Sequence, residues 1–148
     1  MKVVIISDAH GNMGLINRIS MIEDDADAYI DAGDSELDSD HLKPFISVKG
    51  NMDYNFFPLS RILYFEDWKV FLTHGASLDI ISLTNLAKSH GCNVLIYGHT
   101  HKYDESFRNS VYVLNPGSIS RPRDGYKGTY MVVEFNKDNI KVNRKEVY

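Results

Sequence analysis

The chain has little cysteine, no long apolar run and no concentrated positive charge. Its single cysteine, Cys92, excludes an internal disulfide, so nothing points to an oxidising compartment. No apolar stretch approaches the ~20 residues of a membrane-spanning helix. Lysine and arginine are scattered, most densely in the tail "KVNRKEV", and the net charge is −4. A protein that binds a nucleic-acid duplex normally carries a basic surface. We therefore expect a cytoplasmic protein with no membrane contact and no extensive nucleic-acid interface.

The composition is otherwise that of an ordinary globular protein. The 148 residues are 43% hydrophobic and 24% charged, which argues against disorder. The sequence contains no internal repeat, low-complexity segment or linker rich in proline, glycine and serine. The opening "MKVVIISDAHGN" has only a short apolar run before Asp8 and His10, which favours a buried strand over a signal peptide. The sequence thus predicts one domain over residues 1–148 with a single core.

Apolar, strand-like runs repeatedly end in a side chain that can bind a metal ion. Five segments do so: "VVIISDAH" ends in Asp8 and His10, "AYIDAGD" in Asp34, "FISVKGN" in Asn51, "KVFLTH" in His74, and "NVLIYGHTH" in His99 and His101. Each residue alone has an ordinary explanation as a turn or surface group. His41 and His90, which follow no such run, fit that explanation. The repeated position at the end of an apolar run favours a common site.

Helical patterns separate the first strand-like runs. Apolar residues recur at helical spacing in residues 12–24, where Asn12 suits the N-cap, and in residues 78–91, where Gly91 suits the C-terminal end. Residues 35–43 give a weaker helical signal. After Thr100 the pattern changes to short strands joined by turns, which is typical of antiparallel hairpins. The sequence predicts an α/β fold of two packed sheets flanked by helices. In open α/β sheets, ligands bind beyond the carboxyl ends of the strands, where all five run-ending motifs would meet.

The donor types indicate which ions this edge would hold. Two carboxylates, one amide and four imidazoles suit Mn²⁺, Fe²⁺, Zn²⁺ or Ni²⁺ better than Ca²⁺, which prefers oxygen ligands. Seven donors exceed the needs of one tetrahedral zinc ion, whereas two ions that share a ligand fit the number. Two divalent ions beside two aspartates leave a positive centre, which suits an anionic phosphate and lowers the pKa of bound water.

The ordered motifs D-x-H, G-D, G-N-x-D, H-G and G-H-x-H resemble the calcineurin-like metallophosphoesterase superfamily. They are "DAH", "GD", "GNMD", "HG" and "GHTH", and the later "NPGSISRPR" resembles a loop of its small, cap-less bacterial and archaeal phosphodiesterases. The resemblance implies a four-layer α/β/β/α sandwich of two mixed sheets flanked by helices. It also implies two divalent ions, with Mn²⁺ favoured and Ni²⁺, Fe²⁺ or Zn²⁺ as alternatives. The implied catalytic set is Asp8, His10 and His101 on one ion, Asn51, His74 and His99 on the other, Asp34 as the bridge, and Asp53.

The substrate side departs from the family at Met52. The family commonly has a histidine there, or in its small members often a cysteine, and that histidine is thought to contact phosphate and help to protonate the leaving group. A thioether has no such proton. The expected substrate contacts are Asn51, Met52, Ser118, Arg121 and Arg123. For the last three the alternative stays open, because Pro116–Gly117 is a common turn and the arginines also fit a surface role.

The resemblance implies an enzyme that cleaves phosphodiester bonds of a small phosphoester by attack of a metal-activated hydroxide. A phosphomonoesterase or a cyclic-nucleotide hydrolase is an alternative, because the metal ligands contact only the phosphate. The first alternative, from a different class, is a protein-binding scaffold, since a eukaryotic trafficking subunit shares this fold. Such scaffolds tend to lose metal ligands, and the complete set here favours an enzyme. The sequence leaves the oligomeric state open, a homo-oligomer included.

Overall fold

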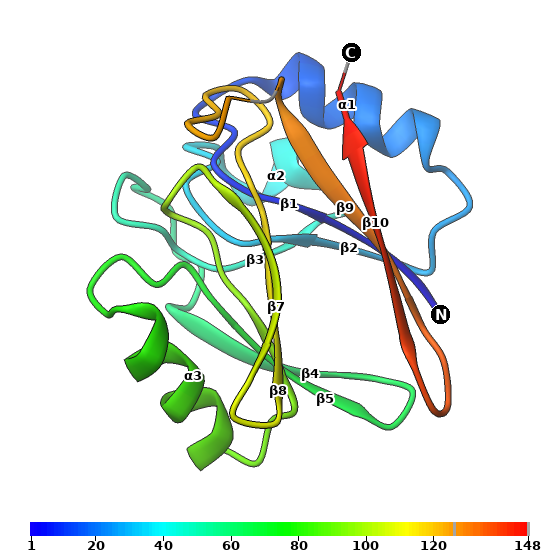
Figure 1. Ribbon diagram of the computed structural model, residues 1–148. Coiled ribbons are helices and arrows are strands. Elements are labelled where there is room, and N and C mark those ends of the chain that lie inside the picture. The colour runs from blue at the N-terminus through cyan, green and yellow to red at the C-terminus, as the bar shows by residue number, and fades with distance from the viewer. Residues whose placement is uncertain (126, 148) are drawn as a thin grey trace.

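Two five-stranded sheets pack face to face, with helices on their outer sides (Figure 1). The computed structural model describes residues 1–125 and 127–147. The main apolar core lies between the sheets and includes Ile5, Ile96 and Phe135, all fully buried. Helices α1 and α3 lie on opposite sides of the molecule (Figure 1). This arrangement confirms the expected four-layer α/β/β/α sandwich of two mixed sheets.

The first sheet has the strand order β10-β9-β1-β2-β3. Its strands are β1 (Lys2–Ile6), β2 (Ala28–Asp31), β3 (Ile46–Ser47), β9 (Thr129–Phe135) and β10 (Ile140–Glu146). Strands β1, β2 and β3 are parallel, and β9 is antiparallel to β1 and β10. Val3 and Ile5 face the inter-sheet core, whereas Val4 and Ile6 face the outer helices. Burial on both faces explains why β1 is apolar throughout.

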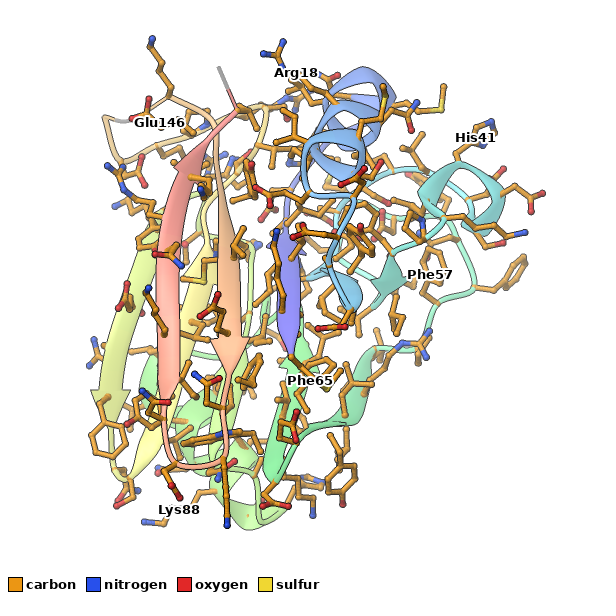
Figure 2. All side chains as sticks on the ribbon, turned by 90° about the vertical axis from the view of Figure 1, so that its right-hand side faces the viewer. Arg18, His41, Phe57, Phe65, Lys88 and Glu146 are labelled. Atoms are coloured by element: carbon orange, nitrogen blue, oxygen red, sulfur yellow. The ribbon has the colours of Figure 1, made fainter. Side chains whose placement is uncertain are left out.

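Two helices cover the outer face of the first sheet. Helix α1 (Met13–Ile22) buries Leu15, Ile16 and Ile19, and the Asn12 side chain accepts a hydrogen bond from its backbone, as expected for an N-cap. Helix α2 (Ser39–Leu42) is a single turn and buries Leu42. The opposite helix faces reach solvent: Figure 2 shows Arg18 on α1 and His41 on α2 pointing outward, and Met21 and Ile22 of α1 are exposed as well. The apolar stripe therefore decides which side of each helix packs on the sheet.

The second sheet has the strand order β4-β5-β6-β8-β7 and carries one helix. Its strands are β4 (Ser60–Phe65), β5 (Trp68–Thr73), β6 (Val94–Ile96), β7 (Tyr103–Arg108) and β8 (Val111–Pro116). Strands β5, β6 and β8 are parallel, so their carboxyl ends share one edge. Helix α3 (Ile80–Ser89) packs Leu83 and Ala87 on Phe71 and Leu95 of this sheet. Among the described residues, no helix is both long and apolar enough to cross a bilayer.

The structure differs from the sequence expectation in one strand. Strand β4 was not expected; it pairs antiparallel with β5 at the sheet edge and leaves Ile62 and Tyr64 exposed. The two late hairpins form as expected, one in each sheet. The β7–β8 hairpin extends the second sheet and the β9–β10 hairpin extends the first. Each sheet is consequently mixed, and each contributes parallel strand ends to the same edge of the sandwich.

Candidate metal centre

The loops after five parallel strand ends bring the predicted donor residues together. Asp8 and His10 follow β1, Asp34 follows β2 and Asn51 follows β3, all in the first sheet. The remaining histidines follow β5 and β6 of the second sheet; they are His74, His99 and His101. In the part of the chain that the structure describes, two groups of three residues place their donor atoms within 4.8 Å of one another. These groups are Asp8, His10 and His101, and Asp34, His74 and His99.

The first group is centred on one oxygen of Asp8. The Oδ1 atom of Asp8 lies 3.3 Å from His101 Nε2 and 3.9 Å from His10 Nε2. Its other oxygen, Oδ2, accepts hydrogen bonds from the Ser7 hydroxyl and the His99 amide, which fixes the carboxylate plane. The two imidazole Nε2 atoms are 3.1 Å apart. One cation could therefore contact all three side chains.

The second group adjoins the first. The Oδ2 atom of Asp34 lies 3.1 Å from His74 Nε2, while its Oδ1 accepts a hydrogen bond from the Met52 amide. The amide oxygen of Asn51 lies 3.2 Å from His99 Nδ1, which places the seventh predicted donor beside this group. Asp8 Oδ1 is also only 3.8 Å from His74 Nε2. The two groups thus share one continuous cluster, in which Asp8 lies within reach of imidazoles from both.

In His101 and His74, a hydrogen bond at Nδ1 orients the ring so that the Nε2 lone pair points toward the cluster. His101 Nδ1 lies 2.7 Å from the Arg121 carbonyl and His74 Nδ1 lies 2.8 Å from the Ala32 carbonyl. Carbonyl oxygens only accept, so each Nδ1 carries the proton and each Nε2 presents a lone pair. His10 Nδ1 has the Glu36 carboxylate as its partner at 2.9 Å. Two lone pairs 3.1 Å apart, on His10 and His101, repel unless a cation lies between them.

Two buried polar atoms supply a direct test of whether a metal fits. Among the described residues, Asp8 Oδ1 and His74 Nε2 are the buried side-chain atoms that lack a hydrogen-bond partner. Leaving a buried acceptor unsatisfied costs about 1–3 kcal/mol, and more for a charged group. Both atoms face the cluster, and mixed carboxylate and imidazole donors suit Mn²⁺, Fe²⁺, Ni²⁺ or Zn²⁺. The residues present therefore fit divalent cations.

Protons and metal ions compete for the donor atoms of this cluster. Burial of the His74 ring opposes its charging, but the carboxylates of Asp34 and Asp8 outweigh burial and raise the pKa of His74 above its ordinary 6.5. Burial likewise disfavours the charged form of Asp34, but the adjacent His74 ring and the Met52 amide lower the pKa of that carboxyl below its ordinary range. A metal ion binds His74 Nε2 only when the ring is neutral, so metal affinity falls as the pH drops through the His74 pKa.

The backbone at the donor residues is held in an unusual conformation. Five of them have positive φ angles: Asp8 (54°), His10 (46°), Asp34 (57°), His99 (72°) and His101 (59°). Non-glycine residues seldom adopt this region, and each instance costs on the order of 1–3 kcal/mol. Such strain persists only where the surrounding structure imposes it, and it concentrates at functional sites. The donors are therefore preorganised by the fold rather than collected by a flexible loop.

Several residues support the donors without facing the cluster. Asp53, predicted as catalytic, is buried and accepts hydrogen bonds from the amides of Asp34, Glu36 and Gly50, so it braces the loop that carries Asp34. The buried Asp31, which the motifs did not indicate, accepts from the Ser47 hydroxyl and the Gly33 amide; burial raises the pKa of Asp31 to about 7. Both carboxylates act on the backbone of the site.

The structure does not support the substrate contact predicted for Ser118. This side chain is fully buried, and its hydroxyl donates to the Asp8 carbonyl while accepting from the Arg121 amide. Asn115 of the same "NPGS" segment donates to the Gly98 carbonyl and the Thr100 hydroxyl. The segment therefore fastens the two loops that carry Asp8 and the "GHTH" histidines, a role that its turn-like sequence did not reveal.

The other predicted substrate contacts line an open cavity above the donors. This cavity of about 230 Å³ is bounded by His10, Asp34, Asn51, Met52, His99, His101, Arg121 and Arg123. Met52 lines this cavity and is 47% exposed. Both arginines are exposed at the rim, and the Arg123 amide also donates to the His101 carbonyl. The cavity brings two positive side chains next to the donor cluster.

Glu36 is a functional candidate that the motifs missed, because it follows Asp34 in a loop and ends no apolar run. Replacing Glu36 by alanine removes the partner of His10 Nδ1 and lets the ring rotate. Losing such an orienting partner typically weakens metal binding by ~10–100-fold. We expect calorimetric titration with Mn²⁺ to show this loss for one of two binding events. The control is Glu105→Ala, which removes an exposed carboxylate on β7. Equal weakening of Mn²⁺ binding in both variants would contradict the role of Glu36 in orienting His10.

Comparisons with known proteins agree with this geometry. A family model described as "Calcineurin-like phosphoesterase superfamily domain" matches residues 1–138. The probable metallophosphoesterase YsnB of Bacillus subtilis strain 168 is 32% identical over 146 residues, covering 93% of this chain and 86% of that protein. A structure from Streptococcus pneumoniae TIGR4, titled a predicted phosphoesterase, aligns with a TM-score of 0.90 at 30% identity, over 99% of this chain and 89% of that one.

Two further structures are similar at lower identity. A structure titled as a novel archaeal phosphodiesterase aligns with a TM-score of 0.78 at 25% identity, over 98% of this chain and all of the other. Vps29 from Entamoeba histolytica, in a single-mutant structure, aligns with a TM-score of 0.76 at 22% identity, over 98% of both chains. At this identity the likeness to Vps29 shows the fold alone.

Proposed function

Because this chain belongs to the calcineurin-like phosphoesterase superfamily, we propose that it is a two-metal phosphoesterase that hydrolyses phosphodiester bonds. The observation that carries the proposal is the pair of adjoining donor groups with buried, unpaired atoms facing each other. When bound, divalent ions would lower the pKa of water to supply a nucleophile and neutralise charge on the phosphoryl oxygens. The first ion would be held by Asp8, His10 and His101, and the second by Asn51, His74 and His99, with Asp34 between them.

The protein side chains bind and orient the substrate in this proposal. Arg121 and Arg123 line the cavity, and guanidinium groups are suited to binding phosphate oxygens. The loop amides and carbonyls that hold Asp8, Asp34 and His101 keep the donors fixed while the phosphate changes geometry. Met52 carries no transferable proton, so expulsion of the alcohol depends on how well the departing oxygen carries charge. Esters of acidic alcohols should therefore react faster than simple alkyl esters.

A comparison of two model substrates tests the proposed reaction. Metal-stripped protein, reconstituted in turn with Mn²⁺, Ni²⁺, Fe²⁺ and Zn²⁺, is assayed on bis-(p-nitrophenyl) phosphate and on p-nitrophenyl phosphate. The proposal expects metal-dependent release of p-nitrophenol, with higher kcat/KM for the diester. The similarity to an archaeal phosphodiesterase favours this order. Faster cleavage of the monoester would assign the protein to phosphomonoester hydrolysis instead.

A protein-binding scaffold is the alternative from a different class. A scaffold has no need of strained, buried donors, because a partner contacts exposed side chains. Here the cluster keeps all seven donors, and its unpaired atoms are buried. These features support hydrolysis over a purely structural role. Lack of turnover on both model esters with every metal would favour the scaffold.

Arg123 provides a test of the substrate side that leaves the donors in place. Changing Arg123 to alanine removes the guanidinium at the cavity rim but keeps the amide that donates to His101. A hydrogen bond to a charged group contributes ~1.5–3 kcal/mol, so kcat/KM should fall by roughly tenfold to hundredfold. Steady-state kinetics and elemental analysis measure the two effects separately, and metal content should not change.

The matched control for this variant is Arg18→Ala, which removes an exposed arginine that points outward from α1 (Figure 2). It should behave like the wild-type protein in both measurements. If Arg123→Ala also kept wild-type kinetics, Arg123 would be an ordinary surface charge.

A further inference from the structure

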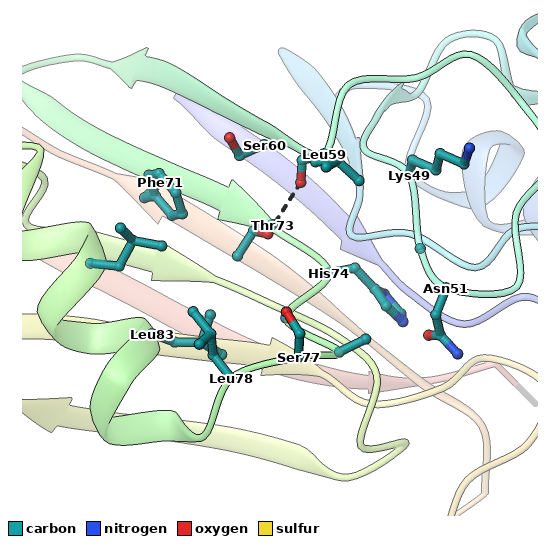
Figure 3. Close-up of a pocket in the computed structure, with 14 residues that line it drawn as sticks. Lys49, Asn51, Leu59, Ser60, Phe71, Thr73, His74, Ser77, Leu78 and Leu83 are labelled. Atoms are coloured by element: carbon teal, nitrogen blue, oxygen red, sulfur yellow. Dashed lines mark hydrogen bonds between the residues drawn. The ribbon is translucent and has the colours of Figure 1, made fainter.

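An apolar pocket of about 430 Å³ extends from the donor cluster along the second sheet (Figure 3). Its lining includes Ser60 at the start of β4, Phe71 and Thr73 of β5, and Leu83 and Leu86 of α3. Figure 3 shows His74 and Asn51 at one end and Phe71 at the other. The volume falls within the ~300–1,000 Å³ typical of small-molecule sites. The pocket is thus large enough for a ring-sized group next to the metal centre.

The lining of the apolar pocket favours a carbon-rich ligand. Phe71 and Leu83 are 4% and 2% exposed and form its inner wall. Leu59 and Leu78 are 72% and 44% exposed and flank its opening. The Thr73 hydroxyl on the pocket wall already donates to the Leu59 carbonyl at 3.1 Å, so it is committed within the protein. The polar side chains of Lys49, Ser60 and Ser77 also line the pocket, so its apolar part is the wall formed by Phe71 and Leu83. A polar group placed against that wall would lose its hydrogen bonds to water without replacement.

The apolar pocket adjoins the phosphate side of the site. Asn51 lines both this pocket and the open cavity that contains Arg121 and Arg123. His74 also lines the apolar pocket through its ring, whose Nε2 faces Asp34. A phosphoryl group bound at the donors would therefore have the apolar pocket on one side and the arginines on the other. An ester substituent is the part of a substrate that would extend into the apolar side.

We propose that the apolar pocket binds the alcohol portion of the substrate and selects phosphoesters whose alcohol carries an apolar or aromatic ring. This assignment rests on the proposed function, because it takes the donors to hold the phosphoryl group. It adds a substrate class, since the donors themselves contact only phosphate. Leu59 and Leu78 at the opening flank the ring, and burial of the ring against Phe71 and Leu83 provides the selectivity.

Binding of two phosphonates tests the assignment without any hydrolysis. Phenylphosphonate and methylphosphonate carry the same anionic head and differ in the ring, and neither has an ester bond to cleave. Calorimetric titration of the Zn²⁺-loaded protein should give a dissociation constant roughly tenfold to hundredfold lower for phenylphosphonate, from burial of the ring. In methyl NMR spectra, the signals of Leu78 and Leu83 should shift with phenylphosphonate and not with methylphosphonate.

Two exposed residues of one short stretch supply the variant and its control. Leu78→Asn places a polar group at the opening and should reduce the preference for phenylphosphonate to a few-fold. Ile81→Asn, on α3 and 69% exposed, lies outside the pocket lining and should keep the wild-type preference. The ratio of the two dissociation constants is taken within each variant, so differences in the fraction of metal-loaded protein cancel.

The outcomes separate this assignment from the proposed hydrolysis. Equal affinity for the two phosphonates, or a preference that Leu78→Asn leaves unchanged, would overturn the role of the pocket even if diesters are cleaved. A retained phenylphosphonate preference without turnover of any ester would support the pocket and count against hydrolysis. Failure of both phosphonates to bind the Zn²⁺-loaded protein would overturn both.

Discussion

Replacing Asp8 by asparagine is expected to abolish tight metal binding and reduce phosphoester turnover by more than about 100-fold, while the metal-free protein stays folded. Loss of a residue that only orients a ligand already costs ~10–100-fold in metal affinity or activity, and Asp8 Oδ1 itself faces imidazoles of both donor groups. The asparagine oxygen can accept the two hydrogen bonds that Asp8 Oδ2 now accepts. The amide nitrogen of the asparagine then takes the place of Asp8 Oδ1 and donates a hydrogen bond to His101 Nε2, so it cannot bind a cation.

Thermal unfolding with and without Mn²⁺ measures this prediction directly. Ligands that bind only the folded state raise the melting temperature, so the wild-type protein should show a metal-dependent rise that Asp8→Asn lacks. The metal-free variant should melt at or above the temperature of the metal-free wild type, because a buried, unpaired carboxylate oxygen has been removed. A variant that binds two ions with wild-type affinity would contradict the position of Asp8 at the centre of the cluster.

Replacing Gly98 by alanine is expected to disrupt both donor groups through a steric collision. A Cβ atom at this position would lie 2.1 Å from the Ser7 hydroxyl oxygen and 3.0 Å from Asp8 Oδ2. Either Ser7 moves and releases Asp8, or the backbone shifts and carries His99 and His101 with it. Overpacking of this kind typically costs 1–3 kcal/mol of stability. We expect that loss in urea denaturation, together with a large loss of metal affinity in calorimetry.

Gly14→Ala is the matched control for the Gly98 variant. Gly14 lies in α1, and a Cβ atom there would have its nearest contact at 3.7 Å, which is ordinary van der Waals distance. Alanine is a better helix former than glycine by roughly 0.5–1 kcal/mol, so this control should be as stable as the wild type or more stable. Wild-type metal affinity in Gly98→Ala would show that the "GHTH" loop tolerates a side chain and that the close approach is not required.

The donor residues were predictable because each follows an apolar, strand-like run in the sequence. Parallel strands bring their carboxyl ends to one edge, so Asp8, Asp34, Asn51, His74 and the "GHTH" pair could be placed together from the apolar runs alone. The helices were predictable from spacing and caps, as Asn12 shows. The supporting groups were not predictable, because Glu36 and Asp31 act on His10 and Ser47, which lie far away along the chain. Ser118 was predicted to contact substrate, but the fold buries its side chain, whose hydroxyl donates to the Asp8 carbonyl.

The distribution of the hairpins between the sheets also could not be read from the sequence. Strands β7 to β10 have the alternation of antiparallel pairs, but their sheet partners depend on contacts with β1 and β6 that lie far away along the chain. Strand β4 was missed because its exposed face carries Ile62 and Tyr64, which blur the apolar alternation of a half-buried strand. Local patterns thus predict element types better than long-range pairing.

The dependence of turnover on bound metal tests the central proposal most directly. Metal-stripped protein is titrated with Mn²⁺, and hydrolysis of bis-(p-nitrophenyl) phosphate is measured against the number of ions bound per chain by equilibrium dialysis and elemental analysis. The two donor groups predict that binding saturates at two ions and that turnover rises steeply as the second ion binds. Saturation at one ion per chain, or two bound ions with no hydrolysis, would contradict a two-metal phosphodiesterase.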